Sequence, residues 1–113
     1  MQALQSVGPF VVVTHYSPYR ILAHSPGEDT IMGCSVDLLR GRSFQIFQGP
    51  NSDWFQLGAA IKDAEPNCPL SIEMDLYDIH GTCERKRIVC TPVCDGGGKA
   101  VASRICISPI AQL

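Results

Sequence analysis

The clearest pattern in the chain is a regular alternation of apolar and polar residues over 70–77. The apolar positions of this stretch are Leu70, Ile72, Met74 and Leu76, and polar or charged residues stand between them. A period of two is typical of a β-strand that buries one face. The pattern therefore predicts a strand over 70–77 whose apolar side faces the core.

Two β-branched runs near the start of the chain have the same character. They cover 10–14 and 20–24, and the dipeptide Ser17–Pro18 between them is typical of a turn. The sequence therefore predicts that these two runs form a pair of strands.

The last third of the chain predicts two more strands joined by turns. A turn over 78–82 leads into a strand over 85–93, and a glycine-rich turn over 95–99 leads into a final strand over 100–107. Together with 70–77, these segments predict three consecutive antiparallel strands.

The segment that follows the first strand pair predicts two short helical pieces. The first covers 27–32, and the second covers 36–39 with Ser35 as its N-cap. Neither piece is long enough to be stable without the rest of the domain.

One longer helix is predicted over 54–64. Asn51 or Ser52 offers an N-cap, and Glu65–Pro66 ends the helix because proline disfavours helical geometry in the residue before it. Its apolar positions form an incomplete stripe, which is typical of a helix that lies against a sheet.

The order of these elements predicts the fold class. Two strands, a helical interlude and three strands indicate an α+β domain in which a five-stranded antiparallel sheet carries short helices and one longer helix on one face. The length of 113 residues fits a single domain.

Composition and charge exclude several classes of partner. The net charge is -2, whereas domains that bind DNA or RNA usually carry a positive charge. Apolar residues make up 45% of the chain, but no apolar run approaches the about 18 residues that a membrane span needs. We expect no nucleic acid and no membrane among its partners.

The six cysteines are too few for a typical secreted disulfide scaffold, and the first residues lack a secretory signal. We therefore expect reduced thiols and an intracellular, cytoplasmic location. The absence of a Cys-x-x-Cys pair argues against a zinc site, so no metal is expected. A weaker alternative is a redox sensor that uses Cys90 and Cys94.

Motifs for catalysis are missing from the sequence. It contains no Gly-x-Ser-x-Gly element, and the glycines at 96–98 are not followed by the Lys-Ser/Thr of a phosphate-binding loop. We expect no catalytic residues and no enzymatic activity of the domain itself.

A longer motif lies over 41–53, where the chain reads GRSFQIFQGPNSD. This segment resembles the signature GRNCRFLQGPxTD of LOV domains, the flavin-binding branch of the PAS family. The upstream segment 32–42, the dipeptide Gly81–Thr82 and the segment 91–93 are also similar to family motifs. The resemblance implies an N-terminal extension over 1–8, a LOV-like PAS domain over 9–108, and a tail over 109–113 that leads to an absent output region.

The resemblance also implies which residues would line a cofactor pocket. Phe44 stands where photoactive LOV domains have the cysteine that forms an adduct with the flavin, and a phenyl group cannot serve as that nucleophile. Several positions that hold polar flavin contacts in the family carry different residues here. One glutamine of the signature, Gln48, is retained. The pocket candidates are Ser43, Phe44, Gln45, Gln48, Leu76 and Lys86.

These substitutions predict that the domain binds no flavin mononucleotide (FMN) and has no flavin photochemistry. The resemblance implies a sensory or signal-transduction module that acts through protein–protein interaction. Its outer sheet face, which includes Val89 and Val93, would contact a partner or form a homodimer. The alternatives are a sensor of a non-flavin small molecule and a residual flavin-binding photoreceptor.

Overall fold

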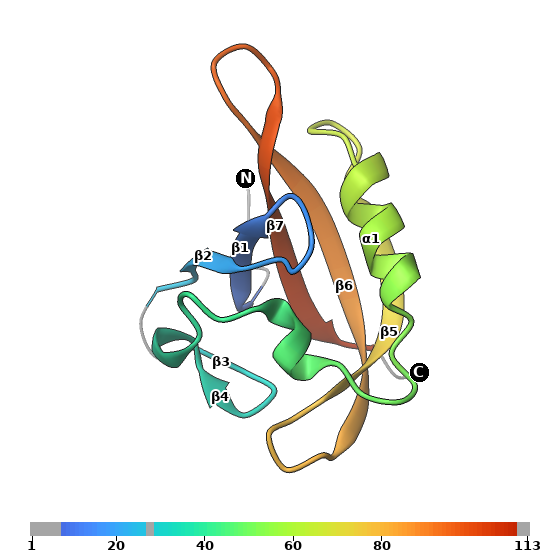
Figure 1. Ribbon diagram of the computed structural model, residues 1–113. Helices are drawn as coiled ribbons and strands as arrows, with labels where there is room; N and C mark the ends of the chain where they lie inside the picture. Colours follow the sequence, from blue (N-terminus) through green and yellow to red (C-terminus); the bar gives the residue numbers. More distant parts are fainter. Residues whose placement is uncertain (1–7, 27–28, 111–113) are drawn as a thin grey trace.

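The computed structural model describes residues 8–26 and 29–110 and contains a five-stranded antiparallel sheet (Figure 1). The strand order across the sheet is β2-β1-β7-β6-β5, so the first and last strands of the sequence are neighbours. The strands are β1 (Phe10–Thr14), β2 (Ile21–His24), β5 (Leu70–Tyr77), β6 (Cys83–Cys94) and β7 (Ala100–Pro109). These bounds confirm the predicted five-stranded sheet, and the last two strands extend beyond their predicted ends.

The two faces of the sheet follow from the register of the strands. Val11 pairs with Ile105, and Ile105 pairs with Cys90, so these three buried side chains form one row across the inner face. On β5, the alternating residues Met74 and Leu76 are buried on the same side. The period-two pattern of the sequence therefore does mark the strand face that packs into the core.

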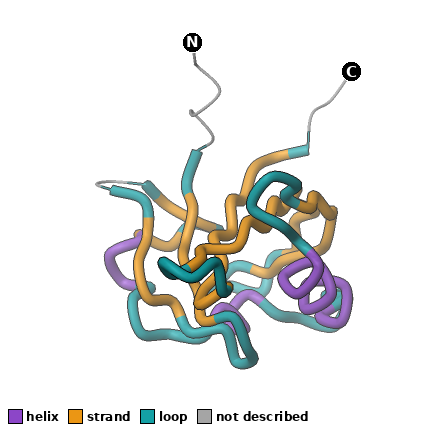
Figure 2. The backbone as a smooth tube through the Cα atoms, turned by 90° about the horizontal axis from the view of Figure 1, so that it is seen from above, coloured by secondary structure: helices purple, strands orange, loops and turns teal. Residues whose placement is uncertain are grey.

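The helical segments lie together on one side of the sheet, as Figure 2 shows. They are two short 3₁₀ helices, η2 (Val36–Leu38) and η3 (Phe44–Phe47), and the helix α1 (Trp54–Asp63), which packs against β5 and β6. The arrangement confirms the α+β fold that the order of elements predicts.

The N-cap of α1 differs from the expected residues. The side chain of Asp53 accepts a hydrogen bond from the Gln56 amide at 3.1 Å, so Asp53 caps the helix, rather than Asn51 or Ser52. The Ser52 hydroxyl instead donates to the Asp75 carbonyl at 2.6 Å and joins the start of the helix to β5. This contact to β5 engages the Ser52 hydroxyl, so Ser52 does not serve as the cap.

The predicted helical piece over 27–32 is wrong where the structure describes it, and residues 27 and 28 lie outside the described residues. The segment forms a small hairpin of β3 (Thr30–Ile31) and β4 (Cys34–Ser35). Its two turn residues, Met32 and Gly33, both have positive φ, which is the geometry that two-residue hairpins favour. Methionine is an uncommon residue at such a position, so the sequence carried little sign of this turn.

The core lies between the inner sheet face and the helical side. Its largest fully buried side chains come from both layers, and they are Phe44, Phe47, Ile21, Ile31, Leu39, Leu57, Ile61, Met74, Leu76, Ile88, Ile105 and Val11. Among residues 8–26 and 29–110, no helix is long and apolar enough to cross a membrane. Nor do those residues contain a group of three or more His, Cys, Asp or Glu side chains able to hold a metal ion.

Candidate functional site

Phe44 occupies the centre of the helical side and is fully buried. Its ring stacks on Trp54, with 5.9 Å between ring centroids and 26° between ring planes, and it meets the edge of Phe47 at 5.4 Å. These distances are typical of favourable aromatic pairs. The residue at the position of the signature cysteine is thus part of a packed aromatic cluster.

The segment that carries Phe44 is held against the turn between β1 and β2. Ser43 caps η3 by accepting a hydrogen bond from the Gln45 amide at 3.0 Å, and its hydroxyl donates to the Pro18 carbonyl. The Phe44 amide donates to the Tyr19 carbonyl at 2.9 Å. Ser43 therefore has a structural role that accounts for both of its hydrogen bonds.

The other pocket candidates lie on different elements. Leu76 on β5 is fully buried and belongs to the same hydrophobic core as Phe44. Lys86 on β6 pairs with Glu84 at 3.0 Å between Nζ and Oε1, and its side chain is largely covered. Gln45 is half-buried and Gln48 is exposed. The structure thus places Phe44 and Leu76 in the core and pairs Lys86 with the carboxylate of Glu84.

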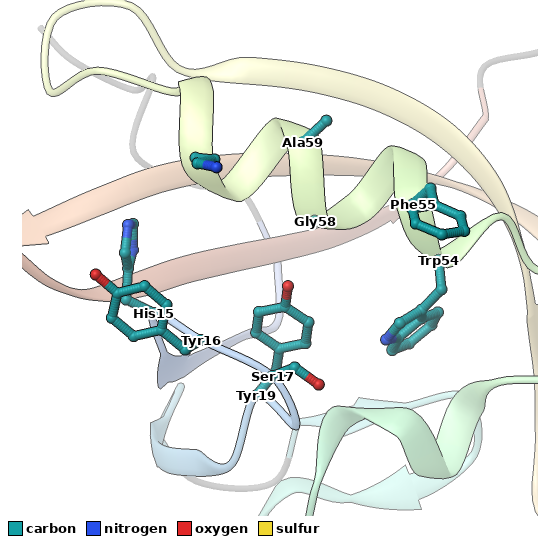
Figure 3. A pocket seen from close by; sticks show the side chains of 9 residues that line it. His15, Tyr16, Ser17, Tyr19, Trp54, Phe55, Gly58 and Ala59 are labelled. Atoms are coloured by element: carbon teal, nitrogen blue, oxygen red, sulfur yellow. The ribbon is translucent and has the colours of Figure 1, made fainter.

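A pocket of about 580 Å³ opens at a different place, between the turn after β1 and the exposed side of α1 (Figure 3). Its walls come from two segments far apart in the sequence. The turn contributes His15, Tyr16, Ser17 and Tyr19. The helix contributes Trp54, Phe55, Gly58, Ala59 and Lys62.

Tyr19 forms the inner wall of this pocket in an uncommon backbone conformation. Its φ is +56°, a value that bulky residues rarely adopt, and strained residues tend to occur at functional sites. The Tyr19 hydroxyl lies so close to α1 that a Cβ at Gly58 would be only 3.1 Å away. A glycine in the middle of a helix costs stability, and here it makes room for the Tyr19 hydroxyl. Burial raises the pKa of Tyr19, so its phenol remains a neutral hydrogen-bond donor.

The sequence did not predict this pocket. It indicated only a turn at Ser17–Pro18 and a helix that starts at position 54. Positions 54, 58 and 62 are four residues apart and share one helix face, which was the only signal available. The approach of the turn to that face arises from the tertiary fold.

The cysteines proposed as a redox pair do not fit a disulfide. Cys90 and Cys94 both lie on β6, and four residues of extended strand span about 13 Å, whereas a disulfide needs Cα atoms within about 7 Å. Burial also raises the pKa of the Cys90 thiol to about 12, so the reactive thiolate is scarce at neutral pH.

The outer face of the sheet combines apolar side chains with charges that are already paired. Arg85 contacts Asp75 at 3.1 Å and Glu73 at 3.8 Å, and Arg87 contacts Glu73 at 3.7 Å. These ion pairs join β6 to β5, so both arginines already have acidic partners within the domain.

Beside these charges lies a mostly apolar surface, with one arginine, that we call the outer-face band. Its rows follow the register of β1, β7 and β6, and its residues are Phe10, Val12, Ala102, Arg104, Cys106, Val89 and Val93. The Arg104 guanidinium lies over the Phe10 ring at 4.1 Å from its centroid. Val93 pairs with Ala102 in this band and is 38% exposed.

Comparison with solved structures finds similar folds among sensory domains. The light-state structure of the LOV domain from the blue-light photoreceptor Aureochrome1 has a TM-score of 0.74 and 24% identity, over 97% of this chain and 88% of that chain. The PAS domain of the fruit-fly ELK potassium channel has a TM-score of 0.73 and 15% identity, over 96% and 90%. A light-oxygen-voltage domain studied with a flavin analogue has a TM-score of 0.74 and 18% identity, over 96% and 82%.

No known family profile matches the chain, and no curated protein matches it. The likeness to solved structures therefore concerns the fold.

Proposed function

From the PAS/LOV fold of the chain, we propose that the domain is a sensory signalling module that acts through protein contacts and does not perform flavin photochemistry. The observation that carries this proposal is the environment of Phe44, which is fully buried and stacked on Trp54. An adduct with a flavin requires a sulfur nucleophile, and the segment that resembles the LOV signature has a phenyl ring in its place.

The surrounding residues also fit a flavin poorly. The neutral amide of Gln45 stands where the LOV signature has a phosphate-binding arginine, and an amide lacks the charge that strengthens such contacts. Leu76, aligned with an asparagine of the family, is buried in the core and offers no hydrogen bond. A polar ring edge buried against these side chains would lose about 1–3 kcal/mol for each missing partner.

The outer-face band supports the second half of the proposal. Its apolar residues surround Arg104, whose guanidinium lies over the Phe10 ring, and the ion pairs of Glu73, Arg85 and Arg87 lie beside them. Aromatic and arginine side chains are enriched in protein interfaces. We infer that a partner protein, or a second copy of this domain, docks on this band.

The proposal is tested by purifying the domain after expression with an excess of FMN. We expect a colourless protein, and equilibrium dialysis should detect no saturable binding of added FMN. The Phe44→Cys variant, treated in the same way, tests whether the thiol alone restores the adduct. A wild-type domain that retains stoichiometric flavin would contradict the proposal.

A second candidate function is the sensing of a non-flavin small molecule. The open pocket beside α1 favours it, because its volume lies in the range of about 300–1,000 Å³ that is typical of ligand sites.

A further inference from the structure

We propose that the pocket between the β1–β2 turn and α1 is a binding site for a small aromatic carboxylate. The inference rests on the second candidate function, the sensing of a small molecule, and names the class of ligand for that pocket. It does not depend on whether the outer-face band binds a protein. Three features of the pocket carry the inference: its aromatic walls, the buried Trp54 N–H group, and the Lys62 ammonium group, neither of which has a side-chain partner among residues 8–26 and 29–110.

The walls favour a flat apolar ligand. Aromatic side chains from the turn and from the start of α1 border the open space, and Gly58 and Ala59 keep its helix side shallow (Figure 3). A planar ring can stack or meet edges among such side chains with favourable geometry. The pocket volume of about 580 Å³ is sufficient for a molecule with two fused rings.

The donors favour a ligand that carries hydrogen-bond acceptors. The Trp54 Nε1–H group is buried, and within the described residues it has no hydrogen-bond partner. Figure 3 shows the indole nitrogen on the side of the ring that faces Tyr19 across the pocket. An unpaired buried donor is destabilising, and a ligand acceptor would satisfy it once the indole turns enough to bring the N–H group to the pocket surface.

The charge of the pocket favours an anion. Lys62 lies in the last turn of α1 and lines the pocket. Over residues 8–26 and 29–110 no carboxylate forms an ion pair with it. None of the nine lining side chains is acidic, so a carboxylate would meet a cation and several donors without repulsion.

This site differs from the position of the LOV signature. Trp54 belongs to both places, because it lines the pocket and its ring also stacks on Phe44. Phe44 itself does not line the pocket. The site therefore uses the side of α1 that faces the β1–β2 turn.

The test uses 2-naphthoate as the probe and its neutral amide, 2-naphthamide, as the matched comparison. Trp54 is the only tryptophan of the chain, so its indole N–H group gives one signal in a ¹H–¹⁵N spectrum. We expect 2-naphthoate to shift this signal saturably. The amide should bind roughly fivefold to tenfold more weakly because it lacks the charge that pairs with Lys62.

Variants separate the pocket from the rest of the surface. Lys62→Gln should weaken 2-naphthoate about fivefold to tenfold and leave 2-naphthamide unchanged, whereas Lys99→Gln, in the distant hairpin turn, should change neither. Ala59→Phe should block the pocket and weaken both probes at least about tenfold. Gln56→Phe, on an exposed position of the same helix outside the pocket, should not.

The proposal is overturned if the indole signal does not shift saturably, if the amide binds as well as the carboxylate, or if the Lys99→Gln and Gln56→Phe controls lose as much affinity as the pocket variants. Circular dichroism verifies that each variant is folded. Loss of the site would remove the support for small-molecule sensing and leave the proposed signalling module without flavin photochemistry intact, because flavin retained in the purified protein is what contradicts that module.

Discussion

Phe44 connects the helical side to the rest of the core through both its ring and its backbone. The ring packs on Trp54 of α1, and the amide is bonded to the Tyr19 carbonyl in the β1–β2 turn. A buried aromatic ring contributes more to stability than an exposed one because its removal leaves a cavity.

Replacing Phe44 with alanine should lower the free energy of unfolding by about 3–5 kcal/mol. The matched control is Phe55→Ala, since Phe55 is also a phenylalanine of the helical side but is 92% exposed. The control should change stability by less than about 0.5 kcal/mol. Urea unfolding followed by circular dichroism measures both, and equal effects of the two substitutions would show that Phe44 is not a core residue.

Cys90 is the residue that gives the domain a predictable pH dependence. Its pKa is raised by burial from the ordinary value of 9.0 to about 12. Below pH 9 the thiol is protonated in both the folded and the unfolded chain. Between pH 9 and pH 12 the unfolded chain releases this proton while the folded chain keeps it, so the Cys90 contribution to stability is lost as pH rises.

We therefore expect the unfolding free energy to fall more steeply above pH 9 in the wild type than in Cys90→Ala. Other groups titrate in the same range, so the difference between the two proteins isolates the Cys90 contribution. Urea unfolding with a reductant present, at steps of pH, gives both slopes. Cys68→Ala, at an exposed position, should keep the wild-type slope, and identical slopes in all three proteins would refute the assignment.

At the level of elements, the connection between η3 and α1 is fastened to β5 by Tyr77 and its neighbours. The Asn51 amide donates to the Tyr77 hydroxyl at 3.1 Å, and the Tyr77 ring lies directly against Gly49. A Cβ at Gly49 would overlap that ring, so the close approach requires glycine.

Gly49→Ala should therefore destabilise the domain by about 1–3 kcal/mol, the usual cost of forcing extra bulk into a packed site. Gly96→Ala is the matched control because a Cβ at Gly96, in the β6–β7 turn, would have no atom within 4 Å. The midpoints of thermal unfolding compare the two variants. A Gly49→Ala protein as stable as the control would mean that Tyr77 does not press on this turn.

The elements themselves were largely predictable because their signals are local. The alternation over 70–77 predicted β5 with the bounds that it has, and the glycines at 96–98 predicted the turn between β6 and β7. The β3–β4 hairpin escaped prediction because its turn uses Met32 in a conformation that sequence composition does not favour. The pocket beside α1 escaped because residues 15–19 and 54–62 are brought together only by long-range packing.

At the scale of the whole molecule, the outer-face band is the surface on which we expect self-association. Val93→Glu places a carboxylate on the band, and removing that charge from water in an interface is costly, so self-association should weaken at least about tenfold. Val101→Glu is the control, because Val101 is exposed but lies outside the band. Analytical ultracentrifugation measures the association constant of each protein. A wild-type chain that remains monomeric at all concentrations would contradict a homodimer through this face.

The placement of β1 has a mechanical consequence for the domain. This short strand contributes Val11 and Val13 to the interior and Phe10 and Val12 to the opposite surface, and it runs directly into the turn that bears Tyr19. Phe10 on the far side of the sheet and Tyr19 in the pocket wall are thus only nine residues apart, and β1 and its following turn join them. A molecule that displaced Tyr19 would pull on the same backbone that positions Phe10 beneath Arg104. Ligand binding in the pocket and partner docking on the outer-face band would therefore both act on β1.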